Sequence, residues 1–552
     1  MCCHSETGSE ADQARLVPFG CNGRVVEHDL PTQNRLINTP GFDEKEGQPM
    51  GTREEIRKRD GTVFPGKIYV DCLLKPVFND QRDHLFQAQF QIHRAHVLML
   101  CDQGILSERE AAEILRGVET LAGIDPSRLR YDPRYEDLFF MVEGLLAEEI
   151  GEEAAGNMHI ARSRNDMGVA MYRLVLREQL LELIGRVQGL REALLEVGEE
   201  HLETVMPAHT HTQPAQPTTL GHYLLAVHDV TERDTRRLWS AYRTVNRSPL
   251  GAAALTTTGF NICRESVKAF LGFDELVENS YDAIAGADYL LETATALILL
   301  MTDAGRWVQD LLQFCTREFN LLRVADPYVQ ISSIMPQKRN PVSVEHSRSL
   351  AGSAIADAQA VCTMIHNTPF GDIVDTEDDL QPHLYRAIDK SNRVLELMTA
   401  VISTMEVNQA EMRRRAGEGL ITVTELADTL VRERGLSFRR AHRIASRVAR
   451  RAFREQRDRI EPEWLREAAE EITGEGMNFP EGKLAEISDP LHFIEVRRCP
   501  GGPHPRETRR MLKDRKERLH ADRREWSRRS EVIRSAGDHL QARVRQLLSQ
   551  NR

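Results

Sequence analysis

Apolar residues recur at helical spacing over most of the chain beyond about residue 86. Apolar positions three and four residues apart fall on one face of a helix, so this pattern predicts amphipathic helices. A capping box formed by Ser107 and Glu110 marks the start of the second helix. Strand patterns are sparse, and the sequence therefore predicts an all-α fold. The helical segments that we expect are 86–102, 107–122, 167–201, 218–246, 283–322 and 342–366.

The later helical segments are longer than a small domain requires. Helices of this length bury their apolar faces against one another, which is typical of a long helix bundle shared between subunits. A chain of 552 residues also exceeds a single small core. We expect an N-terminal helical domain at 66–165, a central long-helix bundle at 166–410 and a C-terminal helical domain at 411–552.

The two ends of the chain differ from this pattern. Residues 1–65 are rich in Gly, Pro and charged residues without a sustained period, which indicates a poorly ordered extension. Cys2, Cys3 and His4 lack a second pair of metal ligands, which favours an unstructured terminus over a metal site. From Arg506 onward, fifteen Arg and Lys stand against seven Asp and Glu. This predicts a solvated C-terminal helix, with nucleic-acid docking as the less favoured alternative.

Composition narrows the class of protein. The net charge of −12 argues against nucleic acid as the main partner, because phosphate binding needs a basic surface. Nine cysteines without framework spacing fit a reducing compartment. No apolar run approaches the length of a membrane span, and the N-terminus lacks the pattern of a signal peptide. We therefore expect a cytoplasmic protein with neither nucleic acid nor a membrane as a partner.

A polar stretch from Ile331 to Pro341 interrupts the helical pattern. Asn340 is expected as the N-cap of the next helix and Pro341 as its first residue. The loop before them would present free backbone N–H groups and the charge of Lys338 to an anion. A serine in that field suits a base or a nucleophile, whereas the alternative is an ordinary polar loop.

Two further polar groups lie before long helices. Ser163, Arg164 and Asn165 offer a carboxylate clamp, although a capped helix start with solvated arginines is the simpler alternative. Residues 208–217 contain two prolines that forbid a continuous helix, which predicts a loop carrying Thr210 and His211. Histidine moves protons near neutral pH, whereas the alternative is a surface histidine in a turn.

The stretch from Ile331 to Pro341 closely resembles the S-S-x-M-P-x-K-x-N-P signature of the fumarase/aspartase superfamily. Other segments resemble the argininosuccinate lyase branch of that superfamily. Segment 159–166 resembles H-T-G-R-S-R-N-D, with departures at Ile160 and Ala161, and Met167 departs just beyond it. Segment 208–217 resembles G-Y-T-H-L-Q-x-A-Q-P, and 248–255 resembles S-P-L-G-x-G-A-L. Segments 424–442 and 500–503 resemble T-D-L-A-D…F-R-x-A-H and G-G-P.

The resemblance implies a long central helix bundle of the fumarase/aspartase type that assembles into a homotetramer. It also implies a lyase that eliminates fumarate from an N-substituted aspartate without a metal or an organic cofactor. Ser332 would be the base, and Lys338 would stabilise the dianion. His211, oriented by Glu345 and aided by Thr210, would act on the leaving-group side. The substrate-binding residues would be Ser163, Arg164, Asn165, Gln213, Ser333 and Asn340.

One segment departs from the branch. Argininosuccinate lyases carry Y-N-K-D-M-Q-E-D-K after the signature, whereas 370–379 here is acidic and lacks the Tyr, the Gln and the second Lys. Gly371, Thr376 and Asp379 stand roughly in their places. An acidic pocket favours a cationic or amine-bearing leaving group and repels a carboxylate. The alternatives are argininosuccinate lyase proper, a catalytically silent structural homologue and a binding protein that uses the basic tail.

Overall fold

The computed structural model describes residues 52–551. The chain divides between Phe64 and Pro65, so the described residues fall into two units, 52–64 and 65–551. The described part of the first unit contains α1 (Arg53–Asp60), which begins with a capping box between Thr52 and Glu55. Cys2, Cys3 and His4, and most of the extension that we expect at 1–65, lie outside the described residues.

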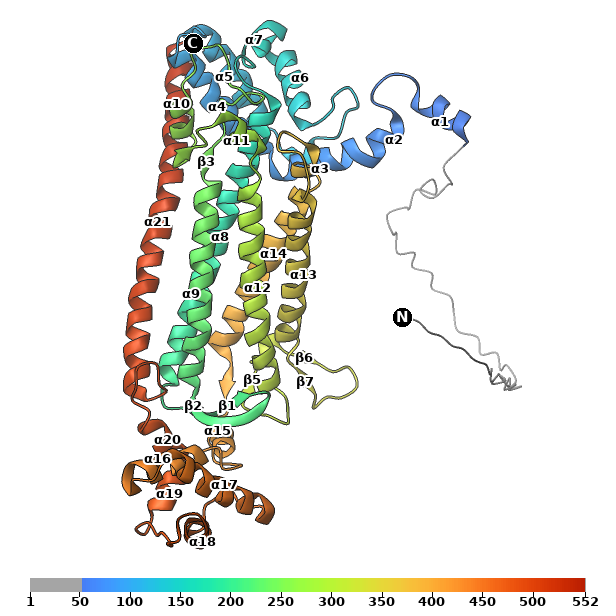
Figure 1. Ribbon diagram of the computed structural model, residues 1–552. Coiled ribbons are helices and arrows are strands. Elements are labelled where there is room, and N and C mark those ends of the chain that lie inside the picture. The colour runs from blue at the N-terminus through green and yellow to red at the C-terminus, as the bar shows by residue number, and fades with distance from the viewer. Residues whose placement is uncertain (1–51, 552) are drawn as a thin grey trace, which may run out of the picture. The chain divides into compact units, whose positions relative to one another are not determined.

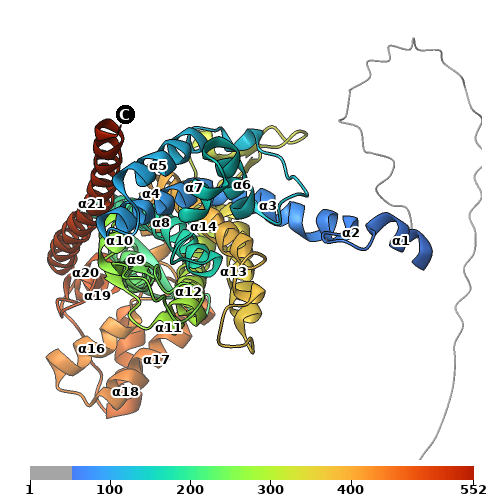
Figure 2. The ribbon, with the colours of Figure 1, turned by 90° about the horizontal axis from the view of Figure 1, so that it is seen from above.

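The second unit is built on five long helices that run side by side (Figures 1 and 2). Helix α8 packs against α9 and α14, and α12 packs against α9 and α13. Their apolar faces form one large core, as the helical periodicity predicts. The fold is all-α. The bounds of the five helices are α8 (Arg164–Glu200), α9 (Leu220–Val245), α12 (Asp288–Phe314), α13 (Val342–Ile365) and α14 (Gln381–Thr404).

A group of shorter helices covers the end of the bundle where α8 begins, the upper end in Figure 1. The predicted segments 86–102 and 107–122 correspond to α4 (Phe86–Asp102) and α5 (Glu108–Ala122). The Ser107–Glu110 capping box is confirmed. The other elements of this group are α2 (Lys67–Tyr69), a π-helical turn (Val70–Leu74), α3 (Lys75–His84), a 3₁₀ turn (Pro126–Arg128), α6 (Leu138–Ile150), α7 (Glu152–Asn157), α10 (Arg264–Phe270) and α11 (Ser280–Ala285).

The expected single helix at 283–322 is wrong, because the chain forms α11 and α12 with a break between them. Gly286 lies at the break, where an added Cβ would come within 2.7 Å of the Asp282 carbonyl oxygen. Helix α12 then ends at Phe314, well before residue 322. Apolar residues lie on both sides of the break, those of α11 and α12 in separate hydrophobic clusters, so an apolar pattern alone does not reveal it.

A second group of short helices at the other end of the bundle has a hydrophobic core of its own, which includes Leu426, Ile444 and Trp464. Together with the helix that leads into it, the group comprises α15 (Gln409–Ala416), α16 (Val423–Arg434), α17 (Phe438–Glu455), α18 (Pro462–Thr473), α19 (Lys483–Ser488) and α20 (Pro490–Glu495).

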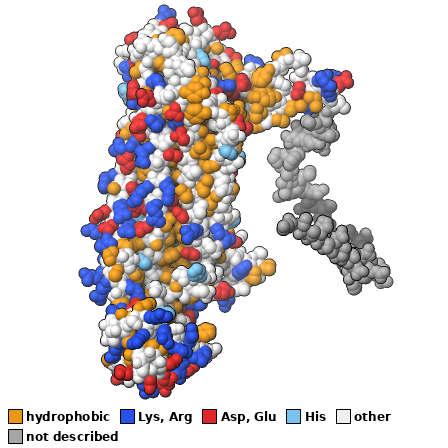
Figure 3. All heavy atoms as spheres, in the orientation of Figure 1, with side chains coloured by type: hydrophobic (Ala, Val, Ile, Leu, Met, Phe, Trp, Pro, Cys, Tyr) orange, Lys and Arg blue, Asp and Glu red, His pale blue; other side chains and the backbone are white. Residues whose placement is uncertain are grey.

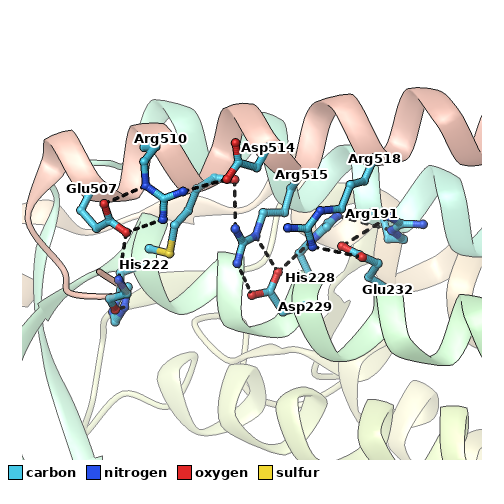
Figure 4. Close-up of polar contacts among 12 residues, drawn as sticks. Arg191, His222, His228, Asp229, Glu232, Glu507, Arg510, Asp514, Arg515 and Arg518 are labelled. Carbon is cyan, nitrogen blue, oxygen red and sulfur yellow. Dashed lines mark hydrogen bonds and ion pairs between the residues drawn. The ribbon is translucent and has the colours of Figure 1, made fainter. Parts of the chain in front are cut away.

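The basic tail forms α21 (Pro505–Gln550), which lies along α8 for much of its length. The helix agrees with the prediction, but several of its charges are docked on the bundle (Figure 4). Arg515 donates two hydrogen bonds to Asp229, at 2.9 and 2.8 Å, and the buried Arg191 binds Asp522. His228, Asp229 and Glu232 lie close together beside these arginines. The carboxylates of Asp229 and Glu232 therefore take part in an ion-pair network with Arg191, Arg515 and Arg518.

Short strands form four two-stranded sheets in the described part of the chain. The loop expected at 208–217 is instead an antiparallel hairpin of β1 and β2, because prolines fit the edge of an isolated strand pair. The expected N-cap at Asn340 is wrong, because Asn340 lies in β7, which pairs with β6. Pro341 occupies the N-cap position of α13 without a side-chain hydrogen bond, and the helix begins at Val342. The strands are β1 (Val205–Thr210), β2 (Gln213–Thr219), β3 (Arg247–Ser248), β4 (Glu275–Leu276), β5 (Leu322–Arg323), β6 (Gln330–Ile331), β7 (Arg339–Asn340) and β8 (Glu406–Val407). Two 3₁₀ turns occupy Asp326–Tyr328 and Val374–Thr376.

Within residues 52–551, no helix combines the length and the apolarity that crossing a bilayer requires.

Candidate active site

The expected carboxylate clamp lies at the start of α8, which begins at Arg164, three residues earlier than expected. Ser163 is the N-cap, and its Oγ accepts a hydrogen bond from the Asn165 backbone N–H at 3.3 Å. The Ser163 backbone N–H donates to Asp166 at 3.0 Å, which completes a capping box. This local geometry places Arg164 and Asn165 in the first turn, where the helix dipole favours an anion.

Asp166 ties this turn to the segment at 248–255. Its Oδ2 accepts hydrogen bonds from the backbone N–H groups of Gly251, at 3.0 Å, and Ala253, at 3.1 Å. Burial raises the pKa of Asp166 to about 6, although three backbone hydrogen bonds favour the ionised form. Two motifs that are separate in the sequence are therefore one structural unit.

Arg164 and Asn165 line a cavity of ≈ 140 Å³ at this end of the bundle. The Arg164 guanidinium lies 3.2 Å from Glu136 and 3.1 Å from Asp137, so the protein already supplies it with carboxylates. The acidic segment forms another part of the wall. The charged residues that line the cavity are Arg164, Glu136, Asp137, Asp372, Glu377, Asp378 and Asp379.

The excess of carboxylates controls the electrostatics of this cavity. Burial, reinforced by the neighbouring Asp372, raises the pKa of Glu377 to about 8. Burial also raises the pKa of Asp378, although Gln81 and Tyr172 donate hydrogen bonds to its Oδ1 at 2.9 and 3.3 Å. A bound cation would relieve this repulsion.

The signature loop lies between β6 and β7 at the opposite end of the bundle. Ser332 is half-buried, and its Oγ accepts hydrogen bonds from the backbone N–H groups of Met335, at 3.1 Å, and Ile334, at 3.4 Å. Ser333 and Lys338 are exposed. Two backbone donors aimed at one hydroxyl oxygen favour a negative charge on it.

The third motif forms the tip of the β1–β2 hairpin. His211 and Thr212 make its two-residue turn, with φ angles of +51° and +63°. Such a turn needs the left-handed region at both residues and normally takes Asn or Gly, so these side chains are held in a strained backbone. Thr210 and Gln213 flank the turn as a pair, and all four residues are exposed.

The expected partner of His211 is elsewhere. Glu345 lies exposed in the first turn of α13, and no hydrogen bond joins it to His211 within the described residues. Ser163 and His211 flank opposite ends of α8, whose 37 residues span about 55 Å. One chain therefore does not bring the clamp and the histidine together.

Comparisons with known proteins agree with the motifs. A family described as "Lyase" matches residues 80–356, and one described as "Argininosuccinate lyase C-terminal" matches residues 420–478. The chain is 39% identical to argininosuccinate lyase 2 of Agrobacterium fabrum over 82% of its own length and 90% of that protein. It is 36% identical to argininosuccinate lyase of Methanosarcina barkeri, over 83% and 93% of the two chains. This chain belongs to the argininosuccinate lyase family.

A solved structure supports the same assignment within the fumarase/aspartase superfamily. An EDDS lyase variant with bound fumarate aligns with a TM-score of 0.79 and 32% sequence identity, covering 91% of this chain and 99% of that chain. As a member of the argininosuccinate lyase family, the protein is a carbon–nitrogen lyase.

Several residues around the clamp of this argininosuccinate lyase homologue were not predicted from its sequence. Asp137 is the N-cap of α6 and faces Arg164, and Tyr172 and Gln81 hold Asp378. An Asp directly before the apolar run at 138–142 is a helix-start signal that could have indicated the Asp137 cap, but no local signal indicates its contact with Arg164. Gln81 and Asp378 are 297 residues apart, so no local pattern could join them.

Proposed function

We propose that the protein eliminates fumarate from an N-substituted aspartate, with Ser332 as the catalytic base. Ser332 would take a proton from the carbon beside the remote carboxylate. The electron pair of that C–H bond would first be held on the remote carboxylate as a dianion. It would then form the C=C bond while the C–N bond breaks, and the nitrogen would leave with a proton supplied from the His211 side. The observation that carries this assignment is the pair of backbone N–H groups on Ser332 Oγ, which stabilises the ionised base.

The remaining motif residues have roles that follow from their charge. Lys338 and Asn340 would stabilise the dianion, and Arg164 with Asn165 would bind the succinyl carboxylates, assisted by Ser163 and Ser333. His211, with Thr210 and Gln213, would act at the leaving nitrogen, with Glu345 orienting its ring. Arg164 must then exchange Glu136 or Asp137 for a substrate carboxylate.

The clamp at the start of α8 lies at the opposite end of the bundle from the signature loop and the hairpin, which supports a site assembled from several chains of a homotetramer. Figure 3 shows a strip of apolar side chains along the exposed face of the long helices. A groove of ≈ 740 Å³ between α9, α12 and α13 lies in this region and is lined in part by Val227, Trp307 and Ile355. Apolar helix faces of this kind favour association with further copies of the bundle.

The acidic cavity supports a leaving group that carries its own positive charge. The carboxylates of this cavity are spread along its wall. Within the described residues, only His228, Asp229 and Glu232, which lie outside the cavity, are close enough together to ligate one metal ion. A spread of negative charge fits an extended organic cation such as a diamine. Argininosuccinate itself is the second candidate, favoured by the names of the relatives. A silent homologue is disfavoured by the presence of Ser332, Lys338 and His211.

A screen of amine addition to fumarate tests this function. Monoamines, diamines and amino acids would each be mixed with fumarate and enzyme, and loss of the fumarate ultraviolet absorbance would be followed. We expect addition with at least one amine, fastest with a diamine, and none with the Ser332→Ala variant. No reaction with any amine, or equal rates for the wild type and the variant, would contradict the proposal.

A further inference from the structure

Helix α17 carries an arginine stripe that the proposed reaction does not use. Five arginines recur at intervals of three or four residues, which places them on one face of the helix. They cover about 22 Å at the rise of an α-helix. The stripe consists of Arg439, Arg443, Arg447, Arg450 and Arg454.

The protein leaves most of this charge uncompensated. Of the seven arginines of α17, two form ion pairs within the described residues, Arg447 with Glu471 and Arg451 with Glu455 and Glu467. The basic helix α21 is different, because acidic residues of the bundle or of its own turns meet many of its arginines. A solvated helix face usually carries both signs of charge, whereas this one carries a single sign.

Part of the arginine stripe lines a groove that also contains an exposed aromatic ring. The charged residues that line a groove of ≈ 960 Å³ are four arginines and one carboxylate: Arg447, Arg450, Arg454, Arg457 and Asp458. Phe453 lines the same groove with 86% of its surface exposed. Phe438, at the start of the helix, is 60% exposed. An exposed aromatic ring beside a row of guanidiniums offers a flat face on which a base can stack.

We propose that the α17 stripe and its groove bind single-stranded nucleic acid. The arginines meet successive phosphates, and Phe453 stacks on a base. The Cβ atoms of neighbouring arginines on one helix face lie roughly 5–6 Å apart. This spacing is on the scale of the distance between successive phosphates of an extended strand. A mononucleotide would reach only the groove and would leave Arg439 and Arg443 without a phosphate.

The net charge of −12, which argues against nucleic acid as the main partner, does not oppose this local site. Exposed charges are screened beyond about 8 Å at physiological ionic strength. A strand on the stripe therefore responds mainly to the arginines beneath it. One phosphate contact for each of the four stripe arginines without an ion pair predicts a salt slope of about −2.8, or a roughly 50-fold loss of affinity between 50 and 200 mM salt.

Fluorescence anisotropy of a labelled twelve-nucleotide RNA or DNA strand, with the full chain, tests the proposal. We expect saturable binding with the salt dependence given above. The variant R439Q/R443Q/R450Q/R454Q breaks no ion pair and should bind at least ten-fold more weakly. The matched control R506Q/R509Q/R524Q/R545Q removes equal charge from exposed positions of α21 that also lack ion pairs, and should change binding less than two-fold.

Two further experiments test the role of the Phe453 ring and the chemical class of the ligand. Phe453→Ala should weaken binding five-fold or more, because stacking on an aromatic ring contributes to single-strand affinity. Polyglutamate of matched charge and a single nucleotide should compete poorly with the strand. The proposal is overturned if the α17 variant binds as the wild type, if the α21 control loses as much affinity, or if polyglutamate or the nucleotide competes equally. Unchanged melting temperatures of the variants would show that the fold is intact.

Discussion

Asp166 accepts a hydrogen bond from the backbone N–H of Gly251, 85 residues away, and so joins the start of α8 to the segment at 248–255. Replacing it by Asn puts an NH₂ group opposite one of the N–H donors that Asp166 now receives. A buried donor without an acceptor costs about 1–3 kcal/mol, so Asp166→Asn should lower the melting temperature by several degrees. Asp375→Asn, at an exposed position, is the control. Equal melting temperatures of Asp166→Asn and wild type would contradict this role.

Ser332→Ala should remove nearly all turnover while the fold and the oligomer persist. A methyl group cannot take a proton, and the loss of a sole base lowers kcat by about three orders of magnitude or more. Ser333→Ala serves as the neighbouring control and should mainly raise KM. Steady-state rates of fumarate release decide the matter, and a Ser332→Ala variant with a tenth of wild-type activity would rule out this base.

Inactive Ser332→Ala and His211→Asn chains should recover activity when they are dissociated, mixed and reassembled. If motifs from different chains make each site, some mixed oligomers contain a site with both wild-type residues. Each variant reassembled alone provides the baseline. Mixing must be shown independently, and mixed oligomers without activity would contradict a shared site.

The enzyme should use argininosuccinate poorly and prefer a leaving group with a distal cation. Asp379 stands roughly where the resemblance implies a lysine, and removing a charged partner of a buried carboxylate costs about 2–5 kcal/mol, or 30-fold to several thousand-fold in kcat/KM. Asp379→Lys should shift the ratio of kcat/KM values toward argininosuccinate. Asp375→Lys adds the same charge outside the cavity lining and should not. A wild-type preference for argininosuccinate over every N-succinyl amine tested would show that this interpretation is wrong.

The stability of the free enzyme should fall as the pH rises from about 4.5 to about 8, in part because of Glu377. Burial beside Asp372 raises its pKa to about 8 from the ordinary value of 4.5, so in this range the folded state holds a proton that the unfolded state has lost. The unfolded state is then favoured with increasing pH. Glu377→Gln should flatten the dependence of melting temperature on pH, whereas Asp375→Asn should not. A diamine that binds the cavity should stabilise the wild type most at the alkaline end.

The candidate site could be predicted only in part from the sequence. Some of its contacts join residues that are close in the sequence, whereas others join separate helices. The signature at 331–341 and the clamp at 163–166 are short strings whose residue types and spacing already indicate an anion-binding loop and a capped helix. The capping boxes at Ser107 and Ser163 depend on residues three positions apart, and local backbone geometry forms them. Arg164 facing Asp137, by contrast, is a contact between two helices.

The sequence by itself determined the all-α class, most of the long helices and the argininosuccinate lyase resemblance, because helical periodicity and motif spacing are local properties of the chain. Only the tertiary structure decided that the acidic segment shares a cavity with Arg164 and that His211 lies at the far end of the bundle. It also decided that Asp166 holds the 248–255 segment. Those relationships depend on how the helices pack over hundreds of residues, and packing is fixed by the whole core. The turn at His211 and Thr212 was missed for a different reason, because the short-range pairing of β1 with β2 imposes a left-handed backbone that neither residue favours alone.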